Sequence, residues 1–86
     1  MSIFVIVSLT PNPQLSAGIA QAYPDNFFTI APDQWLVSTD TLTKEVADKL
    51  NITGGGQGSV AVFKIETYSG WHNKSLWEWI ELKLKK

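Results

Sequence analysis

Residues 33–50 read DQWLVSTDTLTKEVADKL, and this stretch decides the class of fold. An apolar run around Trp35 ends in Ser-Thr-Asp-Thr, and a helical pattern begins at once. Asp40 or Thr41 is placed to cap that helix. The predicted buried face of this helix consists of Leu42, Val46, Ala47 and Leu50. Its exposed face carries the opposite charges of Lys44, Glu45, Asp48 and Lys49. A strand that passes directly into a capped helix is therefore predicted here.

The residues upstream predict a strand, a helix and a hairpin. Ile3 to Leu9 (IFVIVSL) is apolar on both parities until Ser8, which is typical of a strand covered on two sides. Asn12 and Pro13 form a helix start, and the helix ends before Pro24. Its apolar stripe is Leu15, Ile19, Ala22 and Tyr23. The run NFFTIAPDQWLVST then reads as two strands around a Pro-Asp turn.

The residues downstream add a connector, a fourth strand and a tail element. The glycine-rich stretch 54–58 follows a helix and precedes a strand, so a flexible connector is favoured over a phosphate-binding loop. The run SVAVFKIETY is the fourth strand. In the tail, Ser75 and Glu78 fit a capping box and an apolar residue recurs every fourth position, which favours a helix. Perfect alternation over residues 80–84 leaves a fifth strand as the alternative.

These elements predict an α+β fold in one domain, residues 1–86. The order β-α-β-β-α-β is that of a ferredoxin-like sandwich, a four-stranded antiparallel sheet with two helices on one face. Residues 1–70 form this core, and residues 71–86 are the tail element. A chain of 86 residues has room for only one hydrophobic core.

Composition narrows the classes of function. Seven lysines and no arginine balance eight acidic residues to a net charge of −1, which argues against a nucleic-acid surface. The absence of cysteine excludes disulfides and thiolate chemistry. The start of the chain lacks the basic segment of a signal peptide, and no run approaches the roughly 18 apolar residues of a spanning helix. We therefore expect a cytoplasmic protein without a membrane contact.

No group of residues has the spacing of a catalytic or metal site. His72 is the only histidine, and a loop position beside Trp71 is favoured over an acid–base role. Asp33, Asp40 and Asp48 could hold Mg²⁺ in principle, but a turn, a helix cap and a lysine partner explain them better. We expect no catalytic residue, no cofactor and no metal, so a non-catalytic protein is favoured over an enzyme.

Aromatic residues crowd the tail. Trp71, Trp77 and Trp79 lie with Tyr68 among several lysines, an arrangement that could stack single-stranded nucleic acid. Packing of the tail onto the sheet is favoured instead. On a helix Trp77 and Trp79 diverge by about 200°, so at most one of them faces the core and the other is a candidate contact for a partner.

The chain resembles a group of small ferredoxin-like proteins in the stretches IFVIVSL, QWLVST running into TKEVADKL, and VAVFKIETYSG. The group includes the small nuclease-like subunit of the CRISPR adaptation machinery and related antitoxin and mobile-element proteins. The resemblance implies a homodimer and a role in bacterial or phage defence. Metal-dependent nucleases of that group carry an aspartate at the end of the first strand. Here the strand ends Val7-Ser8-Leu9-Thr10, which argues against cleavage.

Strand parity predicts an exposed apolar patch. Lys64 and Glu66 share a parity in the fourth strand, so we assign Ala61, Phe63 and Ile65 to the helix-covered face, with Ile3, Val5, Val7 and Leu9 of the first strand. The opposite face would then be open for a second subunit or for the tail, and a second subunit is favoured. The interface candidates are Phe4, Ile6, Phe27, Leu36, Val60, Val62, Trp71, Trp77 and Trp79.

The expected function is therefore a non-catalytic, homodimeric interaction or regulatory module with a protein partner. Two alternatives stay open: a divergent metal-dependent nuclease, and a small-ligand binder that uses the sheet face and the tail tryptophans.

Overall fold

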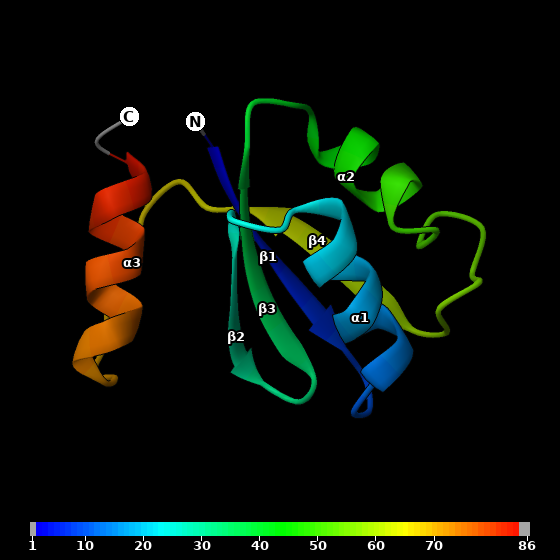
Figure 1. Cartoon of the computed structure of the whole chain (residues 1–86), viewed down its shortest axis with the longest axis horizontal. Helices are drawn as coiled ribbons and strands as arrows, with labels where there is room; N and C mark the ends of the chain where they lie inside the picture. Colours follow the sequence, from blue (N-terminus) through cyan, green and yellow to red (C-terminus); the bar gives the residue numbers. More distant parts are fainter. Residues whose placement is uncertain (1, 85–86) are drawn as a thin grey trace.

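The computed structural model describes residues 2–84 and arranges them in three layers, with a sheet between helices (Figure 1). Two helices, α1 and α2, cover one face of the sheet, and α3 lies against the other. None of the helices in this part of the chain is long and apolar enough to cross a membrane. The elements are β1 (Ser2–Ser8), α1 (Pro13–Ala22), β2 (Phe27–Ala31), β3 (Gln34–Thr39), α2 (Thr43–Lys49), β4 (Val60–Lys64) and α3 (Lys74–Leu84).

The four strands form one sheet in the order β2-β3-β1-β4, and all neighbouring strands are antiparallel. β1 is central, since its Val5 lies opposite Leu36 of β3 on one side and opposite Phe63 of β4 on the other. β2 and β4 are the edges. The α+β class and the four-stranded antiparallel sheet predicted from the sequence are confirmed.

The face of the sheet under α1 and α2 carries the larger core. The side chain of Asn12 accepts a hydrogen bond from the amide of Leu15 at 3.0 Å and caps α1, with Pro13 at its first position. Leu15 and Ile19 are fully buried against the sheet, as their spacing predicts. The remaining buried members are Phe4, Ile6, Tyr23, Trp35, Val37, Val46, Leu50 and Ile52.

The predicted assignment of strand faces is wrong. Phe4 and Ile6 are fully buried on the face that α1 and α2 cover, and Phe27, Val60 and Val62 pack against the same core. These five expected interface residues do share one face, but it is the face that α1 and α2 cover. Leu36 lies on the opposite face, in the cluster with Ile3. β1 is apolar on both parities. Its own sequence therefore does not say which parity lies under α1 and α2 and which lies under α3.

The C-terminal segment is a helix, as favoured, and no residue between Lys74 and Leu84 belongs to a strand. α3 lies over β1 and β2 and buries Leu76 and Ile80 against Ile3 and Leu36. The tail of the same chain therefore covers part of the sheet face opposite α1 and α2, where we expected a second subunit rather than the tail. Leu84 does not continue this buried stripe and is 47% exposed; Lys83 is buried in its place.

Two helix caps differ from the prediction. α2 begins at Thr43 with Leu42 as the capping residue, so neither Asp40 nor Thr41 caps it. Leucine has no side-chain acceptor, and only the reverse bond forms, from the Leu42 amide to the Glu45 carboxylate at 3.2 Å. Leu42 is also 70% exposed and does not belong to the buried stripe.

α3 is capped two residues earlier than the sequence pattern suggests. The side-chain oxygen of Asn73 accepts from the Leu76 amide at 3.1 Å and from the Ser75 hydroxyl at 2.9 Å. Glu78 pairs with Lys74 at 3.6 Å. The expected box between Ser75 and Glu78 is replaced because asparagine three residues before an amide reaches it directly.

Candidate interaction surface

The acidic residues that could have held a metal are spread over the molecule. β1 and β3 run side by side, with Val7 opposite Gln34 at one end and Ser2 opposite Thr39 at the other. Asp33 precedes this ladder and Asp40 follows it, so they lie at opposite ends of β3, about 20 Å apart. Within residues 2–84, no three His, Cys, Asp or Glu side chains gather so that they could hold a metal ion.

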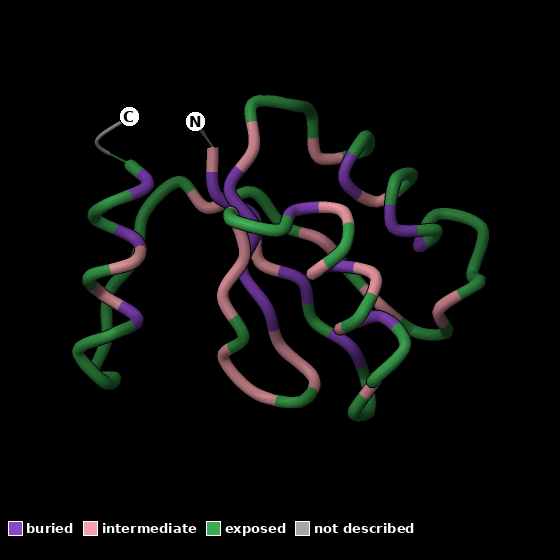
Figure 2. The backbone as a smooth tube through the Cα atoms, viewed as in Figure 1, coloured by how far each residue is buried: buried purple, intermediate pink, exposed green. Residues whose placement is uncertain are grey.

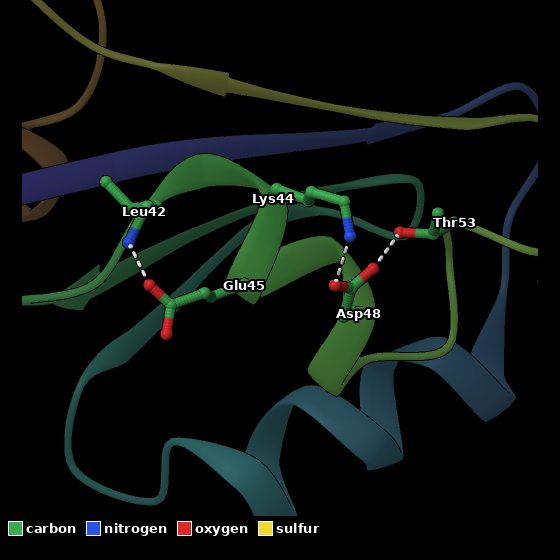
Figure 3. A network of polar contacts seen from close by, with 5 residues as sticks. All are labelled: Leu42, Lys44, Glu45, Asp48 and Thr53. Carbon is green, nitrogen blue, oxygen red and sulfur yellow. Dashed lines mark hydrogen bonds and ion pairs between the residues drawn. The ribbon is translucent and has the colours of Figure 1, made fainter.

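A polar network lies along α2 (Figure 3). Asp48 accepts from Lys44 at 2.8 Å and from the hydroxyl of Thr53, and so ties the helix to the loop that follows it. The hydrogen bonds from Lys44 and then Thr53 lower the pKa of Asp48, and the bond to Asp48 raises the pKa of Lys44. Both side chains are well exposed, so this network is a surface contact between α2 and the following loop rather than a reactive centre.

Two shallow hollows flank Lys49 at the end of α2. The larger, of about 390 Å³, is lined by Tyr23, Thr39, Thr41, Glu45, Asp48 and Lys49. Its charged groups already have neighbours: the Lys49 ammonium lies 4.8 Å from the centre of the Tyr23 ring, and Glu45 accepts from Leu42. Burial, and then the charge of Glu45, raise the pKa of Tyr23. Neither hollow includes the tail tryptophans or the open sheet face expected for a ligand.

The glycine-rich loop is held in place by hydrogen bonds. The Gln57 side chain donates to the Leu50 carbonyl at 3.1 Å, and Asn12 donates to the Gln57 carbonyl at 3.1 Å. A Cβ at Gly56 would lie 2.5 Å from the side-chain nitrogen of Asn51, so a larger residue there would displace the Asn51 side chain. These contacts tie the loop to the start of α1 and the end of α2, so it is more than the flexible connector expected from its glycines.

The open part of the molecule lies on the α3 face of the sheet, over β1 and β4. Val7, Ala61 and Phe63 stand side by side there, since Val7 is opposite Ala61 and Val5 is opposite Phe63. Ala61 is exposed, Val7 is 37% exposed and Phe63 is 56% exposed. α3 contacts β1 and β2 and leaves these three side chains, which we call the open patch, in solvent.

The tail tryptophans divide between packing and solvent. Trp79 packs against Phe28 with ring centres 5.9 Å apart, and Trp77 stacks on Tyr68 at 5.8 Å. Both tryptophans are half-buried against the α3-face core, so packing accounts for both. Trp71 is 97% exposed, and its neighbour His72 is exposed as well. Both lie in the connection between β4 and α3, which is exposed along nearly its whole length (Figure 2). Of the three, only Trp71 has the free ring of a partner contact.

Sequence reasoning placed Phe63 and Val7 in the covered core and so missed the open patch. One signal could have found it. In β3, the parity of Trp35 and Val37 is more apolar than that of Gln34, Leu36 and Ser38. Trp35 therefore marks the face that two helices cover, and antiparallel pairing carries that face to Ile6 and Val62. The charge of Lys64 at the end of β4 pointed to the wrong side.

Comparison with known proteins adds no assignment to this surface. No family model matches the chain, and no curated protein matches it closely enough in sequence to count as a relative.

Proposed function

We propose that this chain is a non-catalytic interaction module that works as a homodimer in a regulatory role, and that the open patch is its binding surface. The resemblance to small ferredoxin-like proteins suggests bacterial or phage defence as the setting. The single observation that carries the proposal is the exposure of Phe63, 56%, on a sheet face that α3 covers only in part. Burying a phenylalanine side chain is worth about 1.5–3 kcal/mol, so an exposed one beside Val7 and Ala61 favours association.

The strand arrangement supports placing the fold with the ferredoxin-like sandwiches. β1 and β2 run parallel with β3 between them, and β3 and β4 run parallel with β1 between them, because every neighbouring pair is antiparallel. Each parallel pair is joined through one helix on the same face, α1 for the first and α2 for the second. Two interleaved crossovers of this kind are what the split βαβ motif requires.

The test compares two exposed apolar side chains. Phe63→Asp places a charge in the open patch, whereas Leu42→Asp places the same charge at the start of α2, where Leu42 is 70% exposed. Light scattering of the full chain up to high micromolar concentration should show that the wild type and Leu42→Asp self-associate and that Phe63→Asp does not. Association that is equally strong in all three proteins would show that the open patch is not the binding surface.

A further inference from the structure

β4 is an edge strand, and among residues 2–84 only β1 pairs with it, so the strand pairing leaves one row of its backbone groups free. Two hydrogen bonds define its orientation: the Leu9 amide donates to the Ser59 carbonyl, and the Ile65 amide donates to the Ile3 carbonyl, each at 2.9 Å. Residues 59 and 65 are thus turned toward β1. Backbone groups alternate along an antiparallel strand, so Val60, Val62 and Lys64 turn their N–H and C=O groups away from the sheet.

We propose that this edge pairs with the β4 edge of a second copy, antiparallel and centred on Val62, so that one sheet of eight strands crosses the dimer axis. The inference rests on the proposed function, and it names the partner and the way in which the partner is held. In this register Val60 lies opposite Lys64 of the second copy, and Val62 lies opposite its own equivalent. All five residues of β4 are used, and every outward backbone group is paired.

Side-chain size on the α3 face fits this register. Phe63 falls opposite Ala61 of the second copy, and the two-fold axis repeats the pair. A large exposed ring thereby meets a small side chain across the strands, where directly opposed residues contact each other. The open patches of the two copies, each with Val7 beside Ala61, then become one continuous apolar strip across the dimer.

Charge disfavours the registers that are centred closer to Lys64. Lysine on an edge strand commonly discourages pairing. A pairing centred on Lys64 would place the two ammonium groups directly opposite each other, and one centred on Phe63 would place them on a diagonal, which like charges disfavour. Centring on Val62 separates the two Lys64 side chains by four strand positions, about 13 Å along the strands. The contact between Lys64 and Glu66 within each chain, 4.0 Å, is left intact.

Covalent capture tests the register, because the chain has no cysteine of its own. Val62→Cys would bring its sulfur opposite its own equivalent, with Cα atoms about 5.5 Å apart, within the range that a disulfide spans. With oxidised glutathione as the oxidant, this variant should form a disulfide dimer. Thr29→Cys, an exposed position on the other edge strand, should stay monomeric on a denaturing gel.

Loss of the edge hydrogen bonds gives the second measurement. Val62→Pro removes an N–H that makes no bond within the sheet, and proline is tolerated at such edge positions. It should raise the dimer dissociation constant about tenfold or more with the fold retained by circular dichroism. Thr29→Pro is the matched control. The hydrogen bond from the Ser38 amide to the Asn26 carbonyl turns the backbone of Asn26 toward β3. Because backbone groups alternate along the strand, the N–H of Thr29 points away from the sheet at the other edge.

Each outcome decides the proposal. A disulfide dimer from Val62→Cys alone, with weaker association of Val62→Pro alone, supports it. A wild type that dimerises and is disrupted by Phe63→Asp, but gives no disulfide at position 62, overturns the edge pairing and leaves the proposed interaction function standing. A wild type that is monomeric at high micromolar concentration, with rapid amide exchange at Val62 and Lys64, overturns both. An edge that is protected only by an added strand-forming peptide overturns the second copy as the occupant.

Discussion

Lys83 is the only charged side chain buried within residues 2–84, and it fastens α3 to the rest of the molecule. Its ammonium donates to the Asp25 carbonyl at 3.0 Å and to the Asn26 side chain at 2.9 Å. It also lies 5.9 Å from the centre of the Trp79 ring. A buried ammonium needs such partners, and its position in the last turn of α3 suits a positive charge.

Replacing Lys83 tests this attachment. Lys83→Met keeps the length of the side chain but removes both hydrogen bonds, and should lower the free energy of unfolding by about 1–3 kcal/mol. Lys74→Met is the control on the same helix, because the Lys74 side chain is 90% exposed; its effect should stay within about 0.5 kcal/mol. Urea unfolding measures both. Equal effects of the two substitutions would remove the role given to Lys83.

Asp48 should make the stability depend on pH in the acid range. The folded state lowers the pKa of this carboxylate, chiefly through the hydrogen bond from Lys44. The unfolded chain therefore binds the proton more readily, and the contribution is present at neutral pH and disappears as the pH falls through the folded-state pKa. Asp48→Asn should melt at a lower temperature than the wild type at pH 7, and the two should converge below about pH 4. A difference that stays constant through this range would contradict the assignment.

At the scale of elements, the parity of β1 decides which substitutions the fold accepts. Ile6 is fully buried under α1 and α2, whereas its neighbour Val7 is 37% exposed on the α3 face. Ile6→Glu should cost more than about 4 kcal/mol and unfold the chain, because it buries an unpaired carboxylate. Val7→Glu should cost about 1 kcal/mol. Circular dichroism melting separates the two, and an unfolded Val7→Glu beside a folded Ile6→Glu would restore the parity predicted from the sequence.

The start of α3 depends on Asn73. Its side chain holds the Leu76 amide, so Asn73→Ala should lower stability by about 0.5–2 kcal/mol and shorten the helix. Ser75→Ala is the matched control, because the Ser75 hydroxyl donates to the Asn73 side chain and, within residues 2–84, bonds no helix amide. Denaturant unfolding and backbone chemical shifts over residues 73–76 report the two effects. A larger loss from Ser75→Ala would favour the capping box that the sequence pattern suggests.

At the scale of the whole molecule, the sheet separates the side chains that a nuclease would need to bring together. Asp33 and Asp40 lie at opposite ends of β3, and β1 ends at Ser8, whose amide bonds the Asp33 carbonyl at 2.9 Å. We expect no cleavage of DNA or RNA with Mg²⁺ or Mn²⁺. Gel assays on a preparation free of contaminating nuclease measure this. Turnover that disappears in Asp33→Asn or Asp40→Asn would establish the nuclease alternative.

Local patterns in the sequence were sufficient for the elements and their order. Asn12 and Pro13 start α1, the Pro32-Asp33 turn joins β2 to β3, and the four-residue spacing from Leu76 to Ile80 marks α3. Each signal acts within one or two helical turns or one hairpin, where backbone geometry depends on the residues nearby. The sequence therefore determined the α+β class without any long-range contact, and it favoured the helical tail over a fifth strand.

Within β1, only the tertiary structure decided which of the two apolar parities lies under α1 and α2 and which lies on the α3 face. IFVIVSL is apolar on both parities, so burial under two helices or under one satisfies it equally well within the strand. The choice depends on Trp35, whose large side chain fills the space between the sheet and α1 and α2, and on Lys83, which finds its partners 57 and 58 residues away at Asn26 and Asp25. Packing volumes and long-range hydrogen bonds are set by the assembled chain, and they leave Phe63 rather than Phe4 in solvent.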